Sequence, residues 1–225
     1  MKKKPITYLI PSLCLLLGFL TWTLLILFMD VRPVGVNGSN IGLSSMNKWF
    51  FGITGSNMIL YSITDWLGLV PIGICVVFGV LGLIQLIKRK RLFAVDKDIL
   101  VLGIYYAIVI LMYLIFEMIP INYRPILIDG HMEKSYPSST TLLVLTVMPT
   151  LSFETHQRIE NKKVIVLIDV FVTSFSLFMV VGRLISGVHW MSDIIGAVLL
   201  SGGLFILYLF FVMLIKSKEE AKYGI

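Results

Sequence analysis

Long apolar stretches, most of them close to the length that crosses a bilayer, constrain this chain more than any other feature. Six of them cover about residues 6–28, 66–87, 99–119, 138–153, 164–182 and 190–215, and the fourth is short. A helix that crosses the hydrocarbon core needs roughly 20 predominantly apolar residues. We therefore predict an all-α, polytopic membrane protein in which six transmembrane helices form one bundle, a single domain of residues 1–225.

The composition agrees with a membrane protein. The chain is 57% hydrophobic and only 14% charged, whereas about a quarter of the residues in a soluble domain are charged. Its net charge of +6 comes from short basic clusters beside the apolar stretches. Such clusters are typical of topology signals and of contacts with anionic lipid head groups, so no nucleic-acid partner is expected. Cys14 and Cys75 lie inside apolar stretches without metal-ligand spacing, and no metal or cofactor is expected.

The basic clusters also predict an orientation. They occupy residues 2–4, 88–91, 156–163 and 216–222, which fall on one side if six spans alternate. Lysine and arginine favour the cytoplasmic side. We therefore expect an integral protein of a bacterial plasma membrane with both termini in the cytoplasm. The outer face then receives the loops 29–65, 120–137 and 183–189, and the first of these should contain a short interfacial helix around 43–51.

Two of the outer loops carry residues suited to phosphate. Arg124 lies just beyond the third span, and the segment "YPSSTT" opens the fourth span with Ser138 and Ser139 near the helix start. Free amides at a helix amino terminus attract anions, and hydroxyl side chains can cap them or bind a ligand. Arg183 supplies a second guanidinium, whose planar fork suits phosphate oxygens.

The loop before the last span adds a nucleophile. His189 and Asp193 are four residues apart, so they share one helix face if the sixth helix begins near residue 188. In that geometry a carboxylate can hold one imidazole nitrogen and leave the other free to attack. The outer ends of the spans are therefore predicted to form one phosphate-handling site.

The spacing of Arg183, His189 and Asp193 carries a family resemblance. An arginine, five residues, a histidine, three residues and an aspartate form the third motif of the type 2 phosphatidic acid phosphatase superfamily (lipid phosphatase and haloperoxidase-like), and all three positions match. The chain resembles the membrane branch of this family, with the motif region at residues 117–193. The six-span layout and the order of the loops are similar as well.

The first two motifs match only in part. The first motif is a lysine, six residues and then Arg-Pro; here Arg124 and Pro125 are present, and Glu117 stands at the lysine position. The second motif is Pro-Ser-Gly-His, and residues 137–140 read Pro-Ser-Ser-Thr. Thr140 thus replaces the family's second histidine, and the chain departs from the family pattern at these positions.

The resemblance implies an enzyme and assigns the roles. His189 would take the phosphoryl group and become a phospho-histidine, and Asp193 would orient the His189 ring. The phosphate oxygens would be held by Arg124, Arg183, Ser138 and Ser139. The implied reaction is hydrolysis of a membrane lipid phosphate at the outer leaflet, without cofactor or metal.

The missing histidine bears on the substrate. In the family it protonates the leaving group, and the hydroxyl of Thr140 does not titrate near neutral pH. A lipid diphosphate, such as an isoprenoid diphosphate, expels a stable anion and depends less on an acid, so it is the expected preferred substrate. His131, the other histidine of the outer loops, is the candidate substitute acid.

Two alternative functions stay open on the sequence. One is a catalytically impaired relative that binds lipid phosphates, although mere binding has no use for an oriented nucleophile. The other is an anion transporter that uses the arginines, against which stands the lack of paired broken helices or inverted repeats in the sequence.

Overall fold

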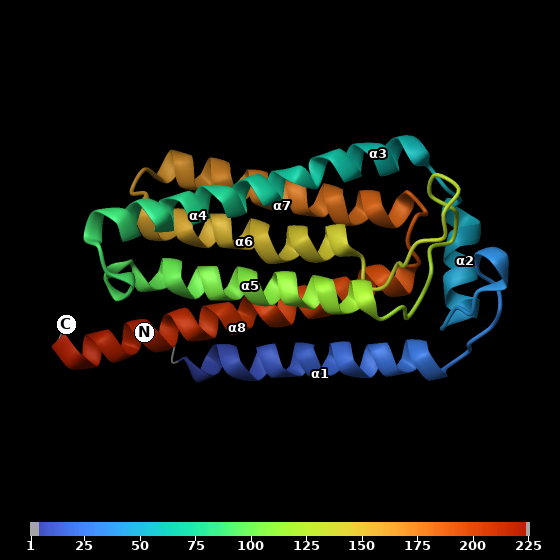
Figure 1. The fold of residues 1–225 in the computed structure, drawn as a ribbon, viewed down its shortest axis with the longest axis horizontal. Coiled ribbons are helices and arrows are strands. Elements are labelled where there is room, and N and C mark those ends of the chain that lie inside the picture. Colours follow the sequence, from blue (N-terminus) through green and yellow to red (C-terminus); the bar gives the residue numbers. More distant parts are fainter. Residues whose placement is uncertain (1–4, 224–225) are drawn as a thin grey trace.

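A computed structural model describes residues 5–223 as a bundle of long helices lying roughly along one axis (Figure 1). The helices are α1 (Ile6–Phe28), α2 (Ser44–Thr54), α3 (Met58–Leu67), α4 (Leu69–Arg89), α5 (Lys97–Met118), α6 (Ser139–Arg158), α7 (Lys162–Ile185) and α8 (Met191–Tyr223). Two single-turn 3-10 helices, η1 (Val36–Gly38) and η2 (Leu92–Ala94), lie in connections. Within residues 5–223 the only strand-like pairing is three isolated bridges, so the all-α prediction is confirmed.

The bundle has two distinct ends. α1 begins and α8 ends at the same end of the bundle, which we call the terminal end; the long connections and α2 lie at the other, which we call the loop end (Figure 1). α2 runs across the loop end rather than along the bundle (Figure 1). Its bounds, Ser44–Thr54, cover the interfacial helix predicted around 43–51.

Within residues 5–223, five helical segments are long and apolar enough to cross a bilayer: Ile6–Phe28, Met58–Arg89, Lys97–Met118, Lys162–Ile185 and Met191–Ala221. The second of them corrects a predicted boundary, because residues 58–65 were assigned to an outer loop and instead form most of α3. Ten residues of helix thus precede Gly68, where α3 passes into α4. The correction places α3 beside α7, with which it packs.

The fourth predicted span, 138–153, corresponds to α6, which lies among the other helices but does not have their apolar composition. It packs against α4, α5, α7 and α8. Three of its buried threonines, Thr146, Thr150 and Thr155, donate their hydroxyls to carbonyls about one turn back, as Thr146 does to Leu142 at 2.7 Å. A helix enclosed by its neighbours does not need an apolar surface for lipid, so its hydropathy is low, and the predicted count of six apolar spans is not confirmed.

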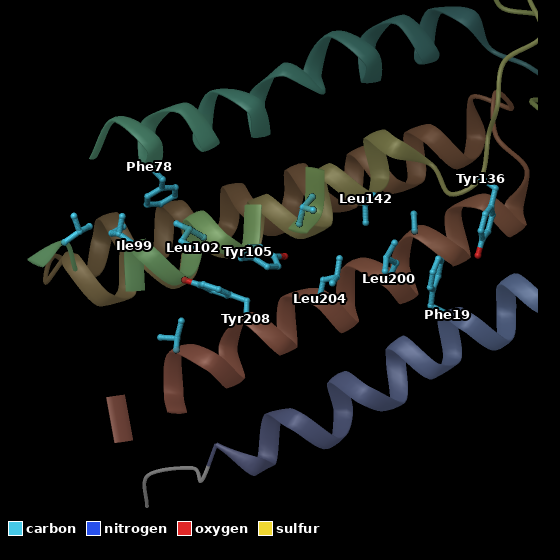
Figure 2. Packing of buried hydrophobic residues seen from close by; sticks show 14 of the residues in the cluster. Phe19, Phe78, Ile99, Leu102, Tyr105, Tyr136, Leu142, Leu200, Leu204 and Tyr208 are labelled. Carbon is cyan, nitrogen blue, oxygen red and sulfur yellow. The ribbon is translucent and has the colours of Figure 1, made fainter. Parts of the chain in front are cut away.

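The main hydrophobic core follows α8, which packs against α1, α5 and α6 (Figure 2). Its buried members include Phe19, Leu102, Tyr105, Tyr136, Leu142, Leu200, Leu204 and Tyr208. α1 approaches α8 closely: a Cβ added at Gly203 would lie 2.8 Å from the Leu16 side chain, and Ser12 Oγ donates to the Gly203 carbonyl at 2.9 Å. This packing fixes α1 against the middle of α8, and the Trp22 indole of α1 donates to the Ser192 carbonyl at 3.0 Å at the start of α8.

Candidate active site

His189 lies in the short turn between α7 and α8 and is only 3% exposed. The turn passes through Gly187, whose φ of +66° favours glycine, and a Cβ there would lie 1.9 Å from the Gly55 carbonyl oxygen. The turn therefore packs against the connection between α2 and α3, and this contact helps to fix the position of the His189 ring at the loop end.

The imidazole has one partnered and one free nitrogen. Nδ1 lies 3.0 Å from the backbone carbonyl oxygen of Ser135. A carbonyl oxygen only accepts, so Nδ1 carries the proton and Nε2 of the neutral ring carries the lone pair. Nε2 is buried, and no hydrogen-bond partner for it lies among residues 5–223. The folded chain thus presents an imidazole nitrogen in the state that a nucleophile requires.

The surroundings keep this ring neutral. Burial lowers the pKa of His189 well below its usual 6.5, and the positive charges of Arg124 and Arg183 lower it further. The hydrogen bond to the Ser135 carbonyl works in the opposite direction and does not overcome them. At neutral pH the ring is therefore unprotonated at Nε2.

Asp193 lies beside His189 but does not hold it in the predicted way. Its Oδ2 is 3.7 Å from His189 Nδ1, which is beyond hydrogen-bond distance. The same oxygen accepts from the Trp190 amide at 3.0 Å, and Oδ1 accepts from Asn122 Nδ2 at 3.3 Å. An acidic side chain that reaches back to the residue before the first turn is half of a capping box. Asp193 therefore caps α8 and places a negative charge near the imidazole, while Ser135 makes the orienting hydrogen bond.

The two predicted arginines converge on one aromatic ring. The guanidinium carbon of Arg183 lies 5.0 Å from the centre of the Tyr61 ring, and that of Arg124 lies 5.8 Å from it. A cation within about 6 Å of a ring centre is attracted by the negative face of the ring. Tyr61, from α3, thus holds together two like charges that would otherwise repel each other.

Each arginine is only partly paired. Arg124 Nε lies 2.9 Å from Glu133 Oε2, and Arg183 Nη1 lies 3.4 Å from Thr64 Oγ1 and 3.5 Å from Asp65 Oδ1. Within residues 5–223, Arg124 Nη1 and Arg183 Nε are buried without a hydrogen-bond partner. Buried donors without an acceptor are costly, so this arrangement favours a ligand that brings several acceptor oxygens.

A cavity of about 380 Å³ opens beside His189 and Arg124, whereas Arg183 is buried behind it and is not among its lining residues. Its lining includes His189 and Arg124, together with Glu117, Glu133, Lys134 and Ser139. It also includes Pro137, the residue before the N-cap of α6, and the Ser138 side chain makes no capping bond to the first amides of that helix. Amides at a helix start attract anions, so both sides of the cavity are suited to a phosphate.

Comparison with known proteins agrees with the geometry. A family model of the PAP2 superfamily matches residues 105–217, the segment that contains Arg124, Arg183, His189 and Asp193. The chain is a member of the PAP2 superfamily. The resemblance carried by the third motif is thereby confirmed, and membership supports a phosphatase-type activity.

The fold is also similar to that of a membrane PAP2 protein. The structure is similar to that of a transmembrane PAP2-type phosphatidylglycerolphosphate phosphatase from Bacillus subtilis, with a TM-score of 0.60 at 17% identity over 89% of this chain and 95% of that one. No curated protein matches the chain in sequence. The five apolar helices and this likeness identify an integral membrane protein with a membrane PAP2 fold.

The residues of the altered PAP2 second motif do not all face the cavity. Ser139 lines it, but Ser138 is fully buried, and its Oγ donates to Thr141 Oγ1 at 3.1 Å. Thr140 lines a separate, mainly apolar cavity of about 520 Å³ between α4, α5 and α6. His131 is exposed in a tight turn with Ile128 and does not line the phosphate cavity. The structure therefore brings Ser139 to the cavity. Ser138 lies beside Asp193, whose carbonyl accepts from the Ser138 amide at 3.2 Å, but its hydroxyl does not reach the cavity. Thr140 and His131 do not line the cavity.

Four residues of the PAP2 site were missed on the sequence: Tyr61, Glu133, Lys134 and Ser135. Tyr61 stands in a segment whose Gly, Ser and Asn content predicted a loop. Ser135 acts through its backbone carbonyl, which every residue type has, so the sequence could not indicate this role. The other two are charged residues beside the second motif, in the connection "GHMEKSYP", and their closeness to Arg124 was the signal that could have found them.

Proposed function

We propose that this chain is a membrane lipid phosphatase in which His189 Nε2 takes the phosphoryl group and water then removes it. The observation that carries the proposal is the buried imidazole itself. Its Nδ1 proton is fixed on the Ser135 carbonyl, its Nε2 has no partner among residues 5–223, and it lines a cavity with Arg124. A histidine with only a structural role would have both nitrogens satisfied.

The proposed reaction has two displacements. Nε2 attacks phosphorus, the bond to the leaving oxygen breaks, and that oxygen keeps the electron pair. The ring becomes cationic, because Nδ1 keeps its proton, and the Asp193 carboxylate at 3.7 Å stabilises that charge. Water then attacks the phospho-histidine, releases inorganic phosphate and restores the lone pair on Nε2.

The phosphoryl oxygens are assigned to the arginines and to the start of α6. Arg124 and Arg183 lie together over Tyr61, so they can neutralise charge on two oxygens of one group. Ser139 lines the same cavity and is the serine that we assign to phosphate binding. Ser138, with its hydroxyl on Thr141, contributes by holding the first turn of α6. Fixed donors at the developing charge are a major source of catalysis.

The preferred substrate is proposed to be a lipid diphosphate. A monoester expels a lipid alkoxide, which needs a proton as it leaves, whereas a diphosphate expels a lipid monophosphate that is already a stable anion. Thr140 stands where the family has its acid and lines another cavity, and His131 is exposed outside the site. Isoprenoid diphosphates are the class that these features favour.

We further propose that α6 is a sixth crossing and that the site faces the outside of a bacterial plasma membrane. α6 runs between the loop end and the terminal end, as α5 and α7 do (Figure 1). The basic clusters at residues 88–91 and 156–163 lie toward the terminal end, which the positive-inside rule assigns to the cytoplasm. Labelling of a single cysteine at position 131 in intact cells tests this, and labelling only after permeabilisation would reverse it.

The function is tested by phosphate release. Purified wild-type protein is assayed with a lipid monophosphate and a lipid diphosphate that carry the same tail, and His189→Gln is the control. Release that depends on His189 and is faster from the diphosphate is expected. Binding of both lipids without release would favour the alternative, a lipid-phosphate-binding protein.

A further inference from the structure

The phosphate cavity contains a second cation, Lys134, whose position is fixed by backbone pairing. Tyr123 and Lys134 face each other in an antiparallel bridge. On either side, the Arg124 amide donates to the Glu133 carbonyl at 2.9 Å, and the Ser135 amide donates to the Asn122 carbonyl at 3.0 Å. Lys134 is thus paired in register with the residue next to Arg124.

Lys134 is also tied to the nucleophile. The next residue, Ser135, supplies the carbonyl that holds His189 Nδ1 at 3.0 Å. Lys134, Arg124 and His189 all line the same cavity. Lys134 is therefore a residue of the cavity that His189 also lines, next in sequence to the carbonyl that holds the imidazole.

The ammonium group has donors to spare. Its Nζ donates to the Glu117 carbonyl, one of the last carbonyls of α5, which have no partner within the helix. A lysine has three donors, and in the described part of the chain Lys134 forms no ion pair. The side chain is partly buried. A compact positive charge with free donors is a phosphate-binding group.

The carboxylates of the cavity do not cancel this charge. Glu133 is engaged by Arg124 at 2.9 Å, and Glu117 is an exposed residue that meets Lys134 through its backbone carbonyl. The cavity of about 380 Å³ also exceeds the needs of one phosphoryl group. One such group takes on the order of 100 Å³ if it displaces about three waters of about 30 Å³ each.

We propose that Lys134 binds the second phosphate of a lipid diphosphate, the one that leaves. Arg124 and Arg183 hold the terminal phosphate, and His189 Nε2 attacks its phosphorus. The Nε2–P bond forms, the bond from phosphorus to the bridging oxygen breaks, and the electron pair stays on that oxygen. The negative charge that develops there lies on the lipid monophosphate, which Lys134 neutralises without giving up a proton.

This assignment deepens the proposed function and rests on it, and Lys134→Gln tests it. The control is Lys48→Gln, which removes an exposed lysine of α2 that does not line the cavity. Farnesyl diphosphate and farnesyl phosphate serve as substrates with one tail. In Lys134→Gln, kcat/KM for the diphosphate is expected to fall about 10-fold more than for the monophosphate, the value of one charge-assisted hydrogen bond. Lys134→Arg should recover most of the loss, and Lys48→Gln should match wild type.

An equal fall for both substrates, or no fall, would overturn the assignment. A second measurement does not need turnover: inorganic pyrophosphate should raise the melting temperature of wild type more than inorganic phosphate does, and Lys134→Gln should lose that difference. If wild type cleaves neither lipid, the proposed function fails. The pyrophosphate difference then still decides whether Lys134 binds a second phosphate.

Discussion

Charged side chains gather at both ends of the bundle, and the two clusters differ in how completely they are paired. At the terminal end Arg158 contacts three carboxylates, Asp98 at 2.6 Å, Glu154 at 3.1 Å and Asp96 at 3.3 Å. Glu154, which is 1% exposed, also accepts from Tyr208 Oη at 2.7 Å. This cluster joins the start of α5, the end of α6 and the middle of α8.

At the loop end the same kinds of group are left incomplete. His189 Nε2, Arg124 Nη1 and Arg183 Nε are buried without partners among residues 5–223. Buried polar groups in folded proteins are nearly always satisfied, and each exception calls for an explanation. The comparison teaches that the paired cluster stabilises the helix packing, whereas the incomplete one is organised for a ligand. The two clusters should therefore respond to mutation in opposite ways.

The largest effect on activity is expected from His189→Gln. The glutamine amide can still donate to the Ser135 carbonyl, so the fold keeps that hydrogen bond while the nucleophile is lost. Phosphate release should fall on the order of 10³-fold or more, and the melting temperature should stay near that of wild type. Turnover within 10-fold of wild type would show that this nitrogen is not the nucleophile.

Arg158→Met should show the reverse pattern. It leaves the buried Glu154 and the partly buried Asp98 without this cation, and one buried charged group that loses its partner costs about 2 kcal/mol or more. Denaturation in detergent should show this loss of stability, whereas kcat/KM at a temperature where the protein is folded should stay within about 3-fold of wild type. If activity collapsed while stability held, the terminal end would not be merely structural.

Tyr61 offers a smaller and more specific test of the loop end. Tyr61→Leu removes the aromatic face shared by Arg124 and Arg183, and Tyr61→Phe keeps it. A cation–π contact of about 1 kcal/mol for each of the two arginines predicts a loss of roughly 30-fold in kcat/KM for the leucine variant. The phenylalanine variant should recover nearly all of it. Equal losses in both would assign the effect to the hydroxyl instead.

The smallest expected effect is a shift in a pH profile. Burial and the two arginines hold the pKa of His189 well below 6.5, so the acid limb of kcat/KM should lie below pH 6.5. In Arg124→Gln one positive charge is gone, the histidine binds its proton more readily, and the limb should move toward higher pH. Comparison of the two proteins on one substrate cancels the titration of the phosphate itself. If the acid limb does not move, the charge of Arg124 does not influence the pKa of His189.

Much of the fold and the centre of the site could be predicted because they depend on local pattern. Apolar length fixes the long helices, and the spacing of Arg183, His189 and Asp193 places three groups at one turn. α6 departed from the apolar rule because a helix enclosed by protein can carry threonines that satisfy themselves. High hydropathy marks helices whose surface contacts lipid, and the surface of α6 is covered mainly by other helices.

The parts that escaped prediction depend on tertiary contact. Tyr61 matters only because α3 continues into α4 and packs against α7, which brings its ring under two arginines from other segments. The Ser138 hydroxyl was predicted to face phosphate, but the start of α6 turns it toward Thr141. Asp193 was predicted to hold the imidazole, but its Oδ2 instead accepts a hydrogen bond from the Trp190 amide and caps α8.

The hydrogen bond from His189 Nδ1 to a backbone carbonyl has a consequence for how this site tolerates change. Every residue that could replace Ser135 brings the same carbonyl, so no single substitution there deletes the acceptor that sets the tautomer. Genetic drift at position 135 can alter the side chain and leave the imidazole in the same tautomer. The tautomer that the proposed nucleophile needs is therefore set by the path of the main chain, which a substitution of the Ser135 side chain does not remove.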